Sequence, residues 1–132
     1  MSPRAAAYVF AALSGLVIAF QLALAAGAPW GEYAMGGAFP GAYPPPMRIA
    51  AVVQSAVLAL VALLVLSRAG VALPSWRRVA GWLAWPIVAL LAVGVVLNLI
   101  TPSTMERLIW APVAIFLFAA ALRVAFSPSA RS

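Results

Sequence analysis

The sequence contains no cysteine, histidine, lysine or aspartate among its 132 residues. Without cysteine there is no disulfide and no thiolate ligand. Without histidine there is no imidazole to bind haem or zinc, or to titrate unperturbed near neutral pH. Two glutamates are the only acids. We therefore expect no metal site, no cofactor, no catalytic residues and no enzymatic activity, because this set offers no conventional nucleophile–base pair.

Charged residues are scarce and apolar residues are abundant, at 8% and 67% of the chain. A soluble domain of this length could not hide so much apolar surface, because small folds leave much of their area in water. The lipid bilayer is therefore the expected partner. The net charge of +6 comes from scattered arginines without a stripe that could follow a phosphate backbone, so we expect no nucleic acid partner.

Four apolar stretches are long enough to cross a hydrocarbon core of about 30 Å, which takes about 20 helical residues. Backbone polar groups in lipid must be satisfied within each segment, so the stretches are predicted to be helices. The fold class is therefore all-α, a bundle of four transmembrane helices in two successive hairpins, forming one domain over residues 1–132. Kinks are expected at Pro86 and Pro112. The predicted spans cover residues 5–26, 49–67, 79–100 and 104–126.

The first span has a second interpretation. Arg4, the apolar run after it and the small residues Ala23-Leu24-Ala25 resemble a secretory signal with its cleavage site. The apolar run is longer than the core of a typical signal, however. We therefore expect a membrane span here.

The arginines predict the orientation of the bundle. Arginine-rich connections stay in the cytoplasm, and only Arg48 and Arg107 would lie on the opposite side. Both termini are therefore expected in the cytoplasm. The absence of lysine and aspartate and the abundance of alanine indicate a GC-rich bacterial genome, which predicts a multi-pass protein of the bacterial inner (cell) membrane. The arginines expected on the cytoplasmic side are Arg4, Arg68, Arg77, Arg78, Arg123 and Arg131.

The outer connection, residues 27–48, holds five of the nine glycines and five of the eleven prolines. A connection of this length is usually functional or disordered, and its four aromatic residues argue against simple disorder. One interpretation is a lid or re-entrant segment over the outer end of the bundle. The other is an interfacial loop that its aromatic residues anchor among the lipid headgroups.

Both glutamates and two arginines fall at this outer end. An unpaired carboxylate near lipid is costly, so Glu32 is expected to have a partner, with Arg48 the first choice and Arg107 the second. The pair either pins the loop or marks a carboxylate that binds a proton or ligand. Ser103 and Glu106 have the spacing of a capping box, in which the serine accepts from the Glu106 amide and the carboxylate reaches back. Glu32, Arg48, Glu106 and Arg107 are the candidate ligand or ion-pair residues.

Three amides lie within the predicted spans: Gln21, Gln54 and Asn98. Hydrogen bonds between helices are the default role for such residues. The alternative is a polar-lined cavity that opens to the outside, with Glu32 and Arg48 at its mouth.

Several of these features occur together in a known pattern. The run Gly27-Ala-Pro-Trp-Gly-Glu32, the pair Gly36-Gly37, the following prolines and Arg48 resemble an uncharacterised family of small bacterial four-span membrane proteins. The resemblance covers nearly the whole chain and includes Asn98 and the bend Ser103…Glu106-Arg107. It implies the four-span fold and singles out the outer loop, but it implies no activity.

Two functions are compatible with these features. The first, which we favour from the sequence, is a non-enzymatic accessory subunit that associates with itself or with a larger membrane complex. Such a protein should be a tightly filled bundle. The alternative is the binding or transport of a small amphipathic or lipid-like molecule, which requires an outward-facing cavity near Glu32 and Arg48.

Overall fold

The computed structural model describes residues 1–128, and that part of the chain is all-helical. The predicted four-helix fold is confirmed, and each helix is long and apolar enough to cross a membrane. The chain is therefore a multi-pass membrane protein. The long helices are α1 (Pro3–Ala25), α2 (Pro45–Arg68), α3 (Arg77–Ile100) and α4 (Thr104–Phe126), with short 3-10 turns η1 (Gly31–Tyr33), η2 (Met35–Gly37) and η3 (Pro74–Trp76) between them.

Three helices begin earlier than their predicted spans, and α3 does so by two residues, at Arg77. α2 starts at Pro45 rather than near residue 49, and α1 starts at Pro3. Proline is favoured in the first turn because its missing N–H would be unsatisfied there anyway and its φ is already helical. Ser2 completes the start of α1, since its hydroxyl accepts a 3.1 Å hydrogen bond from the Ala5 amide.

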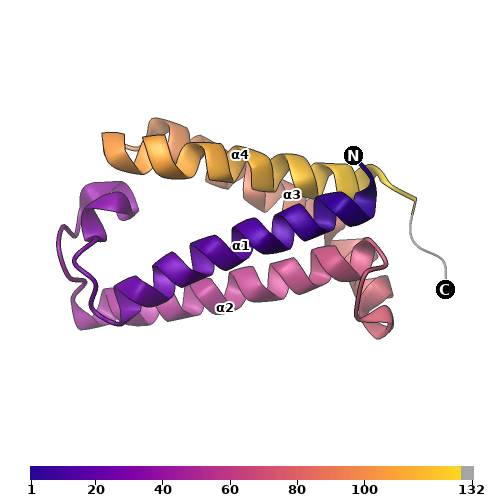
Figure 1. The fold of residues 1–132 in the computed structure, drawn as a ribbon, viewed down its shortest axis with the longest axis horizontal. Coiled ribbons are helices and arrows are strands. Elements are labelled where there is room, and N and C mark those ends of the chain that lie inside the picture. Colours follow the sequence, from indigo (N-terminus) through magenta and orange to yellow (C-terminus); the bar gives the residue numbers. More distant parts are fainter. Residues whose placement is uncertain (129–132) are drawn as a thin grey trace.

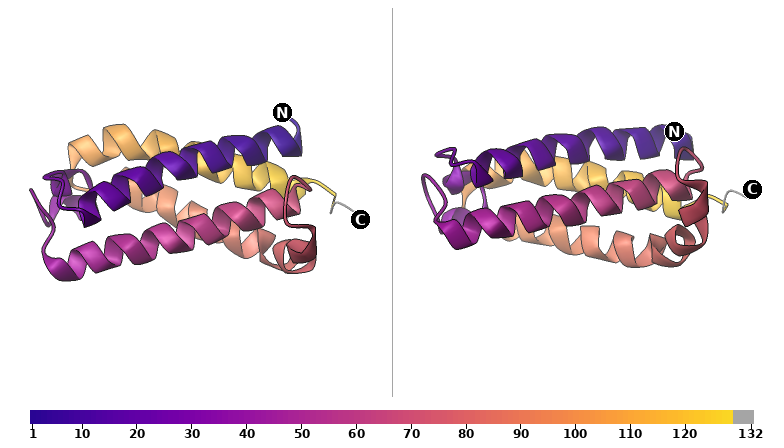
Figure 2. Two further views of the ribbon diagram at one scale, coloured as in Figure 1. Left: turned by 60° about the horizontal axis from the view of Figure 1, so that its bottom comes forward. Right: turned by 90° about the horizontal axis from the view of Figure 1, so that it is seen from below.

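The helices form two antiparallel hairpins, α1 with α2 and α3 with α4, and α1 also packs on α4 while α2 packs on α3 (Figures 1 and 2). The N-terminus, the α2–α3 connection and the C-terminal end of α4 lie together, at what we call the termini end. The loop of residues 26–44 and the α3–α4 turn lie at the opposite, loop end. Pro86 and Pro112 lie inside α3 and α4, and their kinks stay a prediction. Arg131 lies outside the described residues.

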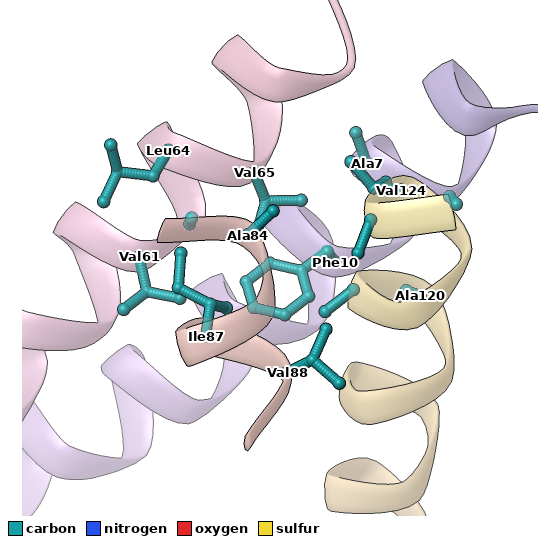
Figure 3. Close-up of a cluster of buried hydrophobic side chains, with 14 of the residues drawn as sticks. Ala7, Phe10, Val61, Leu64, Val65, Ala84, Ile87, Val88, Ala120 and Val124 are labelled. Carbon is teal, nitrogen blue, oxygen red and sulfur yellow. The ribbon is translucent and has the colours of Figure 1, made fainter. Parts of the chain in front are cut away.

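The hydrophobic core fills the termini end. Phe10 of α1 is fully buried, and Figure 3 shows its ring among side chains of α2, α3 and α4 such as Val65, Val88 and Val124. Alanines make up much of the remaining contact surface, and small residues allow helices in a membrane to approach closely. The buried alanines of this core are Ala6, Ala7, Ala62, Ala80, Ala84, Ala120, Ala121 and Ala125.

At the loop end, large side chains take the place of these alanines. Phe20 of α1 packs against Trp110 of α4 with ring centroids 4.6 Å apart. In Figure 1, α1 and α4 diverge toward the loop end. The space opened in this way is the site described next.

Candidate functional site

A cavity of about 600 Å³ lies in the loop-end half of the bundle. Pockets for small molecules occupy about 300–1,000 Å³, so this one is large enough for a ligand. All four helices and the loop contribute to its wall, which is mostly apolar. The apolar and aromatic residues of the wall include Val17, Phe20, Tyr33, Met35, Leu91, Leu97, Ile100, Trp110, Val113 and Leu117.

The three amides singled out in the sequence all line this cavity. They do not make the interhelical hydrogen bonds expected as the default. Asn98 donates to the Gly94 carbonyl of its own helix at 2.8 Å, and within residues 1–128 the side chains of Gln21 and Gln54 make no hydrogen bond to the protein. Free amide groups in an apolar wall can hold the polar part of a bound molecule.

The wall of the cavity is exposed at residues of α2 and α3, which we interpret as a sideways opening. Gln54 is the only residue of α2 in the described wall, and it is exposed. Leu97 of α3 also lines the cavity and is 58% exposed. Both residues lie within helices that are long and apolar enough to span the membrane. By this interpretation the opening faces the hydrocarbon of the bilayer.

Glu106 is the acid that belongs to the cavity. Its amide donates to Ser103 Oγ at 3.2 Å, as the capping box predicts, but its carboxylate does not reach back to the Ser103 amide. Instead, Glu106 Oε2 accepts hydrogen bonds from the Gly36 amide at 2.8 Å and from the Thr101 hydroxyl at 2.9 Å. The Thr101 hydroxyl in turn accepts from the Ser103 amide at 3.3 Å. The carboxylate therefore joins the loop to the start of α4.

The loop closes the loop end of the cavity. Its residues Tyr33 to Gly36 line the wall, and its backbone is folded back on itself by a 2.9 Å hydrogen bond from the Gly31 amide to the Gly41 carbonyl. Buried Tyr43 and Ala34 pack in a small second core with Leu24 of α1. These contacts favour the lid interpretation over a loop that only lies on the headgroups.

Glu32 and Arg48 do not form the expected pair at the mouth of the cavity, and neither lines its wall. Glu32 is exposed, and it contacts the rest of the protein through its carbonyl, which accepts from Ser103 Oγ at 2.9 Å. Arg48 donates from Nε to the Tyr43 carbonyl at 2.8 Å, with its guanidinium close to Gly27. The guanidinium therefore has a backbone partner nearby and lies next to the carboxyl-terminal end of α1, where positive charge is favoured.

Arg107 also binds backbone rather than a carboxylate. Its guanidinium donates to the Thr101 carbonyl at 2.6 Å, directly after α3 ends. Within residues 1–128, no guanidinium hydrogen bond reaches Glu106.

Tyr43 is the loop residue whose titration this carboxylate influences. Burial, and then the negative charge of Glu106, raise the pKa of the Tyr43 hydroxyl above its ordinary value of 10.0.

Sequence reasoning missed several residues of the site. Trp110 lies one helical turn after Glu106 on the same face of α4, a spacing that could have indicated a shared surface. Nothing in the sequence signals that Gly36 and Thr101 meet the carboxylate.

The chain matches no protein-family model, no curated protein and no solved structure. Its function is therefore inferred from the chemistry of the cavity.

Proposed function

We propose that this protein binds a small amphipathic molecule in the loop-end cavity, as a binding protein rather than an enzyme. The observation that carries the proposal is the composition of the wall, in which three amides and one carboxylate are set among apolar side chains around about 600 Å³. Such a wall suits a molecule with an apolar body and a compact polar group. The sideways opening at Gln54 and Leu97 gives this molecule a route from the bilayer.

The accessory-subunit hypothesis has less support from the packing. A tightly filled bundle is its expected feature, and only the termini end is filled in that way. The loop end instead has free amides facing a space. We therefore place the binding function, the alternative in the sequence reasoning, ahead of a role as an interaction subunit.

We further propose that the protein resides in a bacterial inner membrane with both termini in the cytoplasm, so that the cavity lies toward the outer face. The distribution of arginine supports this orientation. The termini end carries Arg4, Arg68, Arg77, Arg78 and Arg123 at or beside the helix ends, and the loop end carries Arg48 and Arg107. Positively charged connections are retained on the cytoplasmic side.

Filling the cavity tests the binding function. A Cβ added at Gly94, which lines the cavity, meets no atom within 4 Å. Leucine can therefore extend from this position into the empty space without displacing the backbone. We expect Gly94→Leu to weaken the binding of a fluorescent long-chain alcohol roughly tenfold, because overfilling a packed site costs about 1–3 kcal/mol. Binding is measured on purified protein in maltoside micelles by fluorescence anisotropy.

Gly81→Leu is the matched control. Gly81 lies on the same helix and its added Cβ also meets no atom within 4 Å, but it is not part of the wall. This variant should bind the alcohol as the wild type does. If the wild type binds no alcohol, or if both variants lose affinity equally, the cavity is not a binding site and the proposal is wrong.

A further inference from the structure

The cavity carries a charge of opposite sign to that of the whole protein. The chain has a net charge of +6, yet none of the arginines in the described part of the chain lines the cavity. Glu106 is the charged group in that wall. An anionic ligand would find no cation there, whereas a cationic ligand would meet a carboxylate in a mostly apolar environment, where charge interactions are strong.

The Glu106 carboxylate keeps capacity for another donor. Both of its hydrogen bonds in the described chain go to Oε2, from the Gly36 amide and the Thr101 hydroxyl. A carboxylate offers about four acceptor positions on its two oxygens. Oε1 therefore remains free to accept from a ligand, while the bonds to Oε2 hold the group in place.

Aromatic rings accompany this carboxylate. Trp110 follows Glu106 by one turn on the same face of α4, and both line the cavity. Phe20 packs on Trp110 and so fixes the indole at the wall. Tyr33 of the loop supplies a third ring. Aromatic faces attract cations, and tryptophan does so most strongly, so the rings and the carboxylate favour the same kind of head group.

We propose that the ligand of this cavity is a cationic amphiphile whose ammonium group binds at Glu106 beside Trp110. Its apolar part then lies along Leu91, Leu97 and Leu117, toward the sideways opening at Gln54. This inference rests on the proposed binding function and adds the charge of the head group to it. An ammonium head can belong to a bilayer lipid or to a free amphiphile, and the experiment separates these two sources.

The test compares two probes with the same fluorophore and alkyl chain, one ending in a primary amine and the other in an alcohol. We expect the wild-type protein in maltoside micelles to bind the amine roughly tenfold more tightly, as hydrogen bonds to charged groups allow. Glu106→Gln should remove this preference by weakening the amine, because glutamine retains the shape and one oxygen acceptor but has no charge. Glu32→Gln, which removes the same charge from an exposed position outside the wall, should leave the preference intact.

A second variant addresses the aromatic part of the site. Trp110→Leu should weaken the amine severalfold more than the alcohol, because leucine retains apolar contact but has no aromatic face. If Glu106→Gln does not fold, Trp110→Leu still tests whether the site prefers a cation. Equal binding of the two probes by the wild type, with both weakened by Gly94→Leu, would overturn the cation assignment and leave the binding function standing. Failure of both probes to bind would overturn both proposals.

Competition identifies the source of the head group. Displacement of the amine probe by phosphatidylethanolamine, but not by phosphatidylglycerol, assigns the ammonium to a bilayer lipid. Displacement by a free alkylamine alone assigns it to a soluble amphiphile. Equal displacement by phosphatidylglycerol would contradict the proposal, because that head group is anionic and carries no ammonium.

Discussion

The backbone N–H of Gly36 donates a 2.8 Å hydrogen bond to Glu106 Oε2, across a separation of 70 residues in the chain. A second bond, from Ser103 Oγ to the Glu32 carbonyl, joins the same two segments at 2.9 Å. The loop is therefore held over the cavity by polar contacts to the first turn of α4. Because Glu106 also lines the cavity, the position of the loop and the chemistry of the site depend on one side chain.

Removing the carboxylate should release the loop. Glu106→Ala deletes the acceptor for the Gly36 amide and the Thr101 hydroxyl. We expect hydrogen exchange of the Gly36 amide to accelerate roughly tenfold to a hundredfold, since hydrogen bonds to charged groups contribute about 1.5–3 kcal/mol. Exchange followed by mass spectrometry of loop peptides measures this. Glu106→Gln should keep most of the protection because it keeps an oxygen acceptor.

Glu32→Ala is the control for this change. Its side chain is exposed, and the contact that Glu32 makes with Ser103 uses the backbone carbonyl, which alanine retains. Loop exchange should therefore stay at the wild-type rate. Equal acceleration in the two alanine variants would mean that acidic charge in general, rather than the bond to Gly36, keeps the loop closed.

The fold of the loop itself depends on Gly31. A Cβ at this position would lie 1.8 Å from the Phe39 carbonyl oxygen and 2.7 Å from that of Gly41. Both obstacles are backbone atoms, so Gly31→Ala must break the Gly31–Gly41 hydrogen bond and separate the two segments of the loop that it joins. We expect a cost of about 1–3 kcal/mol, as for other overpacked sites. Faster chymotrypsin cleavage after Tyr33 would report it.

Gly15→Ala tests whether this effect is local. Gly15 lies on an exposed face of α1, and an added Cβ there meets no atom within 4 Å. Alanine is also a better helix former than glycine. Cleavage in the loop should therefore be unchanged. A Gly31→Ala protein with wild-type cleavage would show that the loop has room that the structure does not.

Alkaline pH should open the loop through Tyr43. Burial, and then the charge of Glu106, raise the pKa of its hydroxyl above 10.0. Below pH 10 the hydroxyl is protonated in both the closed and the open loop, so the closed loop has its full stability there. As pH rises from 10 through the folded-state pKa, only the open form loses its proton readily, and the closed loop loses stability. Tyrosinate absorbance and chymotrypsin cleavage, followed together, measure this change.

Two variants separate the causes. Tyr43→Phe removes the titrating group while keeping the ring that packs on Phe39, so loop stability should no longer fall above pH 10 through this route. Glu106→Gln removes only the electrostatic cause, and it should lower the pKa of Tyr43 part of the way toward 10.0. An unchanged Tyr43 titration in Glu106→Gln would show that the carboxylate does not influence this hydroxyl.

The helices could be predicted closely because their signal is local. Twenty apolar residues with charged ends define a span, and the observed α4 has the predicted bounds, 104–126. The start of α2 was predicted too late because the apolar run begins after Arg48, whereas Pro45 is already helical. Composition alone does not show which prolines lie in a first turn.

The site was only partly predictable, because its contacts are distant in sequence. Gln21, Gln54 and Asn98 could be grouped because each lies in the same half of its span, and all three line the cavity. The partner of Glu32 could not be predicted by proximity, because Arg48 finds a backbone carbonyl five residues away. The role of Glu106 depends on Gly36, whose positive φ of 67° belongs to a loop conformation that sequence does not specify.

The orientation of the bundle can be tested directly because the native chain contains no cysteine. Ala42 is exposed in the loop, and Ser75 is exposed in the connection between α2 and α3, at the opposite end. Single variants Ala42→Cys and Ser75→Cys therefore each report one side of the membrane without background labelling. Neither side chain makes a hydrogen bond within residues 1–128, so both substitutions should preserve the fold.

With both termini in the cytoplasm, a membrane-impermeant maleimide added to intact bacterial cells with a permeabilised outer membrane should label Ala42→Cys and not Ser75→Cys. After the inner membrane is also opened, both variants should be labelled, which confirms that Ser75→Cys is reactive. The physical basis is the concentration of arginine at the termini end, since basic connections resist transfer across the membrane. The reverse labelling pattern would place the cavity toward the cytoplasm, and any amphipathic ligand would then enter from the inner leaflet.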